Sequence, residues 1–127
     1  MIVMGNHEQI CPRFEWAFAL LGKRWTGLII RVLLEGPKRF KDISDMIPNM
    51  SDRMLAERFK ELERAGLVVR RVYAETPVRI VYELTPKGEA LRPVMEAVQK
   101  WGDEWVTDSD CDEYQRRYKC SSRDKAL

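Results

Sequence analysis

The chain has 127 residues and a hydrophobic content of 45%, which suits one globular domain rather than two. Its formal net charge is +2, so the total charge does not decide whether a nucleic acid is the partner; the placement of the charges must. The longest apolar run, residues 28–34, is interrupted by Arg31, and the first residues do not resemble a signal peptide. We therefore expect a cytoplasmic protein that does not associate with a membrane.

The N-terminal part of the chain predicts two helices. Residues 1–10 are expected to form a flexible N-terminus. Pro12 suits the first turn of a helix, and apolar residues at helical spacing predict a helix over residues 12–21, ended by Gly22 in a left-handed conformation. A second helix is predicted from residue 25 or 26 to residue 35, before Gly36-Pro37. Its expected buried face consists of Leu28, Ile29, Val32 and Leu33.

The central stretch, residues 39–84, predicts a short helix, a turn, a longer helix and a hairpin. The short helix covers residues 39–47, and Ser51 is a good N-cap for a helix that Gly66 terminates. Residues 67–73 and 80–84 have the composition and alternation of two β-strands. This order is typical of a winged helix-turn-helix, in which the longer helix enters the major groove of DNA.

The C-terminal part predicts a long helix from Thr85-Pro86 to about residue 106, with a kink or break near Leu91 caused by Pro93. Residues 107–127 form a charged tail in which a short helix over residues 113–119 is an open option. The predicted fold class is α+β: a winged helix-turn-helix with additional N- and C-terminal dimerisation helices, its domain spanning residues 11–106. The apolar residues expected to serve dimerisation are Phe14, Val98, Trp101 and Trp105.

The helix after Ser51 supplies the candidate DNA-binding residues. On a helical wheel, Leu55, Phe59 and Leu62 fall on one side and a polar face lies opposite. Such a face is often only solvated, but the flanking short helix and hairpin favour base reading. The residues expected to approach base edges are Ser51, Asp52, Arg53 and Glu57. Arg58 and Lys60 are expected either to touch phosphate or to form intramolecular pairs.

Two further groups flank this helix. Lys38, Arg39 and Lys41 begin the short helix, where they serve either as solubilising charge or as phosphate contacts that fix orientation. Thr76 and Arg79 lie in or beside the hairpin loop and are expected to reach the minor groove or the backbone. For Arg70 and Arg71 the strand pattern leaves a structural and a phosphate-facing role open.

The three cysteines, Cys11, Cys111 and Cys120, are an odd number and do not form the disulfide framework of a secreted protein. Cys11 is either a small buried hydrophobic residue or a thiol sensor activated by the helix that follows it. Cys111 and Cys120 are its candidate partners or bystanders. A metal site with His7 would have loose ligand spacing, so we expect neither a metal nor a cofactor.

Several pieces of the chain together resemble the HxlR family of bacterial transcription regulators. They include Cys11-Pro12, residues 21–25, Gly36-Pro37 with Arg39-Phe40, residues 51–63, residues 66–68, residues 70–73, Pro77, residues 82–85, Gly88 and Trp101-Gly102. The resemblance implies a homodimeric winged-helix repressor that binds a near-palindromic operator. It also implies sensing of quinones, diamide, aldehydes or hypochlorous acid through the cysteine matching Cys11, although it does not identify the inducer.

Three other functional classes remain as alternatives. One is a winged-helix regulator switched by a small ligand without thiol chemistry, for which Trp16, Trp25, Trp101 and Trp105 could form an aromatic pocket. Another is a winged-helix module that binds a protein instead of DNA. The third, a thiol enzyme using Cys11, lacks a plausible base because His7 is the only histidine, so we expect no enzymatic activity.

Overall fold

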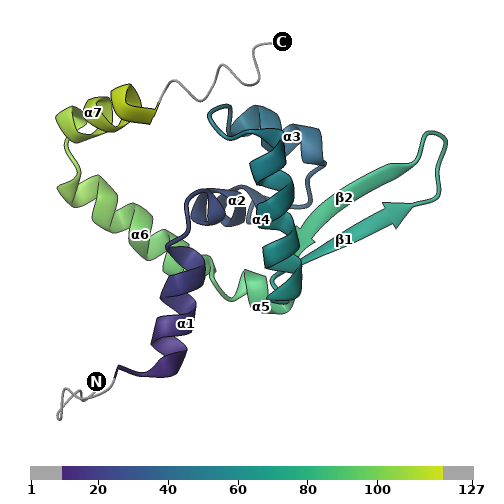
Figure 1. Cartoon of the computed structure of the whole chain (residues 1–127), viewed down its shortest axis with the longest axis horizontal. Helices are drawn as coiled ribbons and strands as arrows, with labels where there is room; N and C mark the ends of the chain where they lie inside the picture. The colour runs from purple at the N-terminus through teal and green to yellow at the C-terminus, as the bar shows by residue number, and fades with distance from the viewer. Residues whose placement is uncertain (1–9, 119–127) are drawn as a thin grey trace.

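A computed structural model describes residues 10–118 of the chain (Figure 1). Along the chain, the elements are α1 (Pro12–Leu21), α2 (Thr26–Leu33), α3 (Phe40–Met46), α4 (Asp52–Arg64), β1 (Val68–Tyr73), β2 (Arg79–Leu84), α5 (Pro86–Glu89), α6 (Arg92–Trp105) and α7 (Asp108–Tyr118). The predicted flexible N-terminus lies outside the described residues except for Ile10, and so does Cys120. Within residues 10–118, no helix is long and apolar enough to cross a membrane.

The hydrophobic core is built by α2, α3, α4 and the start of the hairpin. Its buried side chains are Ile29, Ile30, Val32, Leu33, Ile43, Ile47, Met50, Leu55, Phe59, Leu62, Leu67 and Val68. The three apolar positions predicted for the face of α4 are all in this set, as the helical period requires. The core therefore fixes α4 against α2 and α3, with its polar side directed outward.

Strands β1 and β2 form an antiparallel hairpin in which Val68 pairs with Leu84 and Tyr73 with Arg79. The segment before α3 adds a third strand-like contact. The Lys38 amide donates to the Tyr82 carbonyl at 3.0 Å, and the Tyr82 amide donates back to the Lys38 carbonyl at 2.8 Å. This pairing joins the hairpin to the helix-turn-helix unit, and the predicted winged helix-turn-helix fold is confirmed.

Two predictions about the N-terminal helices were wrong in detail. Gly22 is not left-handed, with φ at −79°; a Cβ there would lie 2.8 Å from the Phe18 carbonyl oxygen, so close approach explains the glycine. The left-handed residue of this loop is Trp25, with φ at 80°. Leu28 was assigned to the buried face of α2, but it is 49% exposed, while Ile30 is fully buried in its place.

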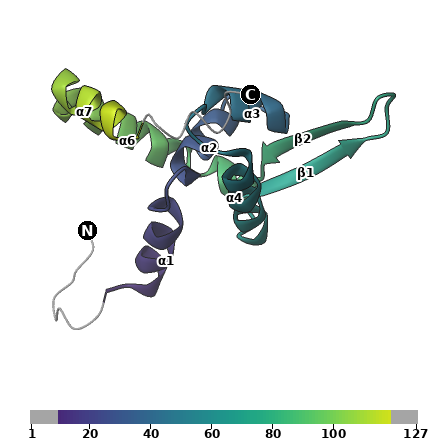
Figure 2. The same cartoon turned by 45° about the horizontal axis from the view of Figure 1, so that its top comes forward.

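Helices α6 and α7 extend away from the core on the side opposite the hairpin (Figures 1 and 2). The Thr85 hydroxyl accepts from the Gly88 amide as an N-cap, and the predicted break falls between α5 and α6, just before Pro93. Within the predicted charged tail, α7 spans Asp108–Tyr118 and so begins earlier than the short helix over residues 113–119 that the sequence left open. A reason for the early start is the cap at Thr107, whose hydroxyl accepts from the Asp110 amide at 3.1 Å.

Candidate nucleic-acid interface

The start of α4 is held by two side-chain hydrogen bonds. The Met54 amide donates to the Ser51 hydroxyl oxygen at 3.2 Å, which satisfies one of the unpaired amides of the first turn. The Ser44 hydroxyl of α3 donates to the Asp52 carboxylate at 2.6 Å. This second bond joins the two helices of the motif. Ser51 and Asp52 therefore have structural roles, and any contact with a base would be an additional role.

The outer face of α4 presents Arg53, Glu57 and Lys60, which are all exposed. The opposite face carries the buried Leu55, Phe59 and Leu62. A helix fixed on one side and lined with long hydrogen-bonding side chains on the other has the form required of a major-groove reader. The structure therefore brings these three predicted residues onto one accessible surface.

Arg58 lies apart from that surface. Its Nε donates to the Arg24 carbonyl at 2.8 Å, its Nη1 lies 3.2 Å from the Glu61 carboxylate, and its side chain is only 13% exposed. Lys23 binds the same carboxylate at 3.0 Å. This arrangement matches the intramolecular alternative for Arg58, and it joins α4 to the loop between α1 and α2.

The Glu61 carboxylate is the acidic centre of this cluster. The hydrogen bond from Lys23 is the largest influence that lowers the pKa of Glu61, and the positive charges of Arg58 and Lys23 lower it further, against a smaller opposing effect of burial. A carboxylate held by two cations stays ionised at neutral pH. Sequence reasoning did not pair Glu61 with Lys23, because the two lie 38 positions apart and no local pattern links them.

The predicted basic group before α3 is divided between local bonds and solvent. The Lys38 ammonium lies 3.6 Å from Glu35, and Lys41 lies 3.3 Å from Asp45 in the next turn of α3. The Arg39 amide donates to the Asp42 carboxylate at 3.2 Å as an N-terminal cap, and the Arg39 side chain is exposed. Exposed ion pairs of this kind are weak and can open for a phosphate.

In the hairpin loop, Arg79 forms a two-pronged contact with Glu75, at 3.0 and 3.3 Å, and its guanidinium lies 4.2 Å from the centre of the Tyr73 ring. The hydrogen bond from Arg79 lowers the pKa of Glu75. Thr76 is exposed at the tip. Arg70 and Arg71, whose roles the strand pattern left open, are both exposed, and Arg71 is paired with Glu83 on the neighbouring strand.

The described thiols, Cys11 and Cys111, are both exposed and unbonded. Cys11 is the N-cap residue of α1, directly before Pro12, and Cys111 lies in α7. The start of α1 and helix α7 lie far apart in both views (Figures 1 and 2). Because Cys11 is exposed, the alternative of a buried Cys11 is wrong for the single chain. Among residues 10–118, no cluster of three or more His, Cys, Asp or Glu side chains could hold a metal ion.

The predicted dimerisation residues are exposed on two helices, α1 and α6. Trp101 is 61% exposed and Trp105 is 68% exposed, and Phe14 and Val98 are also exposed. Trp16, Phe18, Val94 and Val106 extend this apolar exposure over α1 and α6. Large exposed apolar patches on globular proteins mark interaction sites. Of the four tryptophans, only Trp25 packs against the core, so an aromatic pocket shared by all four does not form in the chain.

A family model described as HxlR-like helix-turn-helix matches residues 20–110. The chain belongs to the HxlR-like helix-turn-helix family. The resemblance predicted from the sequence is therefore confirmed, and the match covers the whole helix-turn-helix unit, the hairpin and α6, while the later part of α7 lies beyond it.

HxlR relatives of this chain are named as transcriptional regulators. The HTH-type transcriptional regulator YodB from Bacillus subtilis is 54% identical over 112 residues, which cover 87% of this chain and 98% of YodB. The uncharacterised HTH-type transcriptional regulator YvaP from the same organism is 50% identical over 107 residues, covering 84% of this chain and 99% of YvaP. The chain is thus a transcriptional regulator of the HxlR type.

Solved HxlR-type structures share the fold. The reduced form of YodB superposes with a TM-score of 0.71 at 55% identity, covering 77% of this chain and 96% of that one. The quinone-bound form of YodB gives a TM-score of 0.67 at 52% identity over 76% of this chain and all of that chain. The redox regulator HypR in its oxidised form gives 0.71 at 30% identity, over 75% of this chain and 98% of HypR.

Proposed function

We propose that this HxlR protein is a homodimeric repressor that binds a near-palindromic operator and is released by oxidants or electrophiles acting on Cys11. Its α4 helices enter successive major grooves, and the two hairpins flank them. The observation that supports this best is the accessible face of Arg53, Glu57 and Lys60 on a helix that the core holds rigidly. As a DNA-binding regulator, it acts in the cytoplasm and not as an enzyme.

The DNA surface has a reading part and a positioning part. Arg53 and Glu57 face base edges, since an arginine can bind guanine through two hydrogen bonds and a carboxylate can accept from cytosine. Lys60, Lys38, Arg39 and Lys41 contact phosphate, while Thr76 and Arg79 flank the groove from the hairpin. Ser51 and Asp52 hold α4 in place at its start, and Arg58 does so through Arg24.

The second copy covers the apolar surface of α1 and α6. Trp101 and Trp105 recur with Val98 at helical spacing, so two antiparallel copies of one stripe can pack against each other about a two-fold axis. A dimer of this kind presents two recognition helices at a fixed separation. Two half-sites about one helical turn apart then give a near-palindromic operator. Residues 11–106 form this dimerising, DNA-binding domain, and the charged segment after residue 106 is an addition to it.

Both an oxidant and an electrophile can react with the Cys11 thiol. Diamide accepts two electrons and two protons from two thiols, so its azo bond becomes a hydrazine while one disulfide forms. The second thiol is Cys111 or Cys120, and in a homodimer it can come from the other subunit. A quinone instead accepts the Cys11 thiolate at a ring carbon, and the ring takes up the proton. YodB has been studied in diamide-treated and quinone-bound forms, which supports this chemistry here.

The experiment measures binding of the full chain to duplex DNA from upstream of its own gene. We expect tight binding that weakens steeply with salt, weak binding to a scrambled duplex, and loss of operator binding after diamide treatment. Cys11→Ser should keep the affinity and abolish the response. Operator binding that diamide leaves unchanged would reject the thiol switch, and binding that does not distinguish the two duplexes would favour a protein-interaction module.

One observation favours a ligand-switched regulator as a second candidate. A cleft of about 280 Å³ lies between α2, the turn after α3 and the end of α7, lined by Trp25, Leu28, Arg31, Met46 and Tyr118 among others. If the Cys11→Ser protein still lost its operator in the presence of a small molecule, this cleft would be the first place to locate that molecule.

A further inference from the structure

We propose that Tyr118 of α7 is a positioning residue for the recognition helix and that it acts through Arg24. The inference rests on the proposed DNA-binding function of α4, and it assigns a role to the part of α7 that lies beyond the HxlR family match. Two contacts carry it: the Arg24 guanidinium lies over two aromatic rings, and the Arg24 carbonyl accepts a hydrogen bond from α4.

The Arg24 guanidinium contacts two aromatic rings. Its Cζ is 4.3 Å from the centre of the Trp25 ring and 4.6 Å from the centre of the Tyr118 ring. Both distances are within the range in which a cation is attracted to the face of an aromatic ring. Tyr118 therefore reaches from the end of α7 to the loop between α1 and α2.

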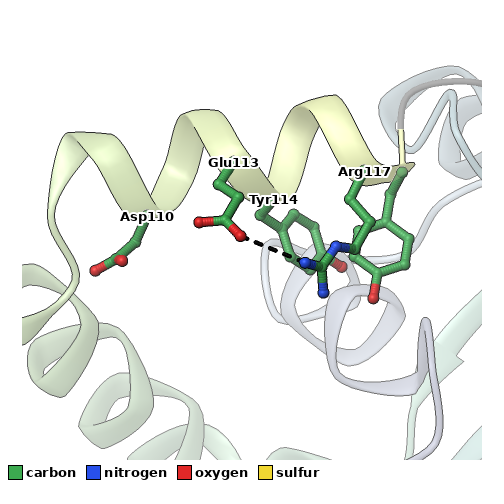
Figure 3. A pocket seen from close by; sticks show the side chains of 5 residues that line it. Asp110, Glu113, Tyr114 and Arg117 are labelled. Carbon is green, nitrogen blue, oxygen red and sulfur yellow. Dashed lines mark hydrogen bonds and ion pairs between the residues drawn. The ribbon is translucent and has the colours of Figure 1, made fainter.

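Helix α7 contacts the helix-turn-helix unit, and this contact places Tyr118 near Arg24. Tyr114 and Tyr118 pack against each other with ring centroids 4.5 Å apart, and both line the cleft whose other wall includes Trp25 and Leu28. Figure 3 shows Tyr114 on α7, beside the Glu113–Arg117 ion pair that runs along the helix. The exposed Leu28, which the helical pattern had assigned to the core, lies in this cleft.

The loop between α1 and α2 also binds the recognition helix α4. The Arg24 carbonyl accepts the 2.8 Å hydrogen bond from Arg58 Nε, and Lys23 binds Glu61 one turn further along α4. The backbone of Trp25 is left-handed, a conformation that residues other than glycine rarely adopt. Surrounding contacts therefore have to maintain the loop. The Tyr118 ring on Arg24 is one such contact.

The consequence is a physical path from α7 to the DNA-reading face. When Tyr118 holds Arg24, the Arg24 carbonyl is fixed and Arg58 anchors the middle of α4. When the ring is removed, the loop gains freedom and α4 is held less firmly in the orientation that reads bases. Because Cys111 lies two turns before Tyr118 on α7, a bond formed by Cys111 could also withdraw the ring.

The test compares Tyr118→Ala with Tyr118→Phe, which keeps the ring, and with Gln115→Ala, a neutral truncation at an exposed position of the same helix. Binding of the full chain to the upstream duplex and to a scrambled duplex is measured over a series of salt concentrations. We expect Tyr118→Ala to bind the upstream duplex roughly two- to five-fold more weakly, the range that one exposed cation–ring contact supplies. The scrambled duplex and the salt dependence should be unchanged, and the two other variants should match wild type.

A double variant examines the path itself. Arg24→Ala combined with Tyr118→Ala should bind no more weakly than Arg24→Ala alone, because the second change removes a contact already lost. Additive losses would overturn the proposal, as would a Tyr118→Ala protein that binds like wild type or a Tyr118→Phe protein that binds like Tyr118→Ala. A fall in salt dependence with equal loss on both duplexes would indicate direct phosphate contact near α7 and would also overturn it.

Amide hydrogen exchange separates this proposal from the DNA-binding function. If the wild-type protein does not bind the upstream duplex, the proposed function fails, but the contact can still be measured in the free protein. Faster exchange in residues 58–61 of Tyr118→Ala, and not of Gln115→Ala, would support the path. Unchanged exchange there would overturn it. None of the core side chains comes from α7, so the variant is expected to stay folded.

Discussion

The ring of Phe59 in α4 is stacked on the ring of Tyr82 in β2, with centroids 3.9 Å apart and planes 13° apart. The ring of Phe40, at the start of α3, also lies near Phe59, with ring centroids 6.2 Å apart. Tyr82 also provides the main-chain groups that bind Lys38. The recognition helix, the helix before it and the hairpin thus meet at one aromatic cluster, so they are expected to move as one body.

Replacing Tyr82 by Ala should therefore destabilise the whole motif. Loss of a half-buried ring and of its stacking is expected to lower the free energy of unfolding by about 2–3 kcal/mol. Urea denaturation followed by circular dichroism measures this change. Tyr82→Phe keeps the ring and should cost less than about 1 kcal/mol; equal losses for the two variants would contradict the stacking explanation.

Gly88 is predicted to be intolerant of any side chain. A Cβ at this position would lie 2.3 Å from the Leu67 carbonyl oxygen and 2.9 Å from a methyl carbon of Leu84, where α5 crosses the base of the hairpin. Gly88→Ala should lower the free energy of unfolding by roughly 2–4 kcal/mol, because backbone as well as side chain would have to shift.

Gly27→Ala is the matched control for Gly88. No atom lies within 4 Å of a Cβ at Gly27, which is inside α2, so the alanine should raise stability by about 0.5–1 kcal/mol through helix propensity. Thermal melting of both proteins tests the pair. A Gly88→Ala protein as stable as wild type would show that α5 is packed less closely than described.

The Glu61 cluster predicts a specific pH dependence. Because the folded-state pKa of Glu61 is lowered, chiefly by its hydrogen bond from Lys23, the ionised carboxylate stabilises the fold at pH values above the ordinary pKa of glutamate. That contribution should be lost as the pH falls through the lower folded-state pKa. Since the pair with Lys23 is exposed in part, the effect should be at most about 1 kcal/mol.

Urea denaturation of wild type and of Glu61→Gln, from neutral to acidic pH, measures the Glu61 contribution. The difference between the two proteins should be largest at neutral pH and should shrink as Glu61 is protonated. Glu63→Gln, two residues further along α4, serves as the comparison. A difference that grows toward acidic pH would have the wrong sign for a lowered pKa.

The sequence was sufficient to predict the fold because its signals are local. Ser51 caps α4, Thr85 caps α5, Pro93 breaks the C-terminal helix, and the apolar stripe of α4 is buried. Each depends on residues a few positions apart, where the backbone period sets which side chains share a face. The outward-facing Arg53, Glu57 and Lys60 followed from the same period.

The remainder could not be predicted because it depends on contacts between distant residues. Arg58 donates to the Arg24 carbonyl 34 positions earlier, and no pattern within α4 identifies that partner. Leu28 fits a buried stripe on the helical wheel, yet it is half-exposed in the cleft beside α7. The left-handed residue was assigned to Gly22 on propensity, whereas loop packing imposes that conformation on Trp25.

Arg53→Ala is predicted to reduce sequence recognition by α4. An arginine that binds a guanine edge through two hydrogen bonds contributes about 1–3 kcal/mol of discrimination, so operator affinity should fall roughly ten-fold or more while scrambled DNA is bound almost as before. Titrations with both duplexes at one salt concentration measure the ratio. Equal loss on both would assign Arg53 to phosphate contact. Lys60→Ala, by contrast, should weaken binding to both duplexes alike and reduce the slope of log affinity against log salt concentration by about one.

The exposed tryptophans of α6 give the last prediction. Trp105 is 68% exposed and does not belong to the core, so Trp105→Glu should leave the fold of one chain intact. A buried tryptophan at the centre of an interface is often worth about 2–4 kcal/mol, and an unpaired carboxylate adds a desolvation cost, so self-association should weaken roughly 100-fold or more. Sedimentation equilibrium should then find monomers where wild type is dimeric.

Lys100→Ala, a truncation at an exposed polar position of the same helix, should leave that equilibrium unchanged. The monomeric Trp105→Glu protein should also bind the operator much more weakly than wild type, because one recognition helix can occupy only one half-site at a time. If Trp105→Glu stayed dimeric, the second copy would have to pack elsewhere, and the separation of the two α4 helices would not be set by α6.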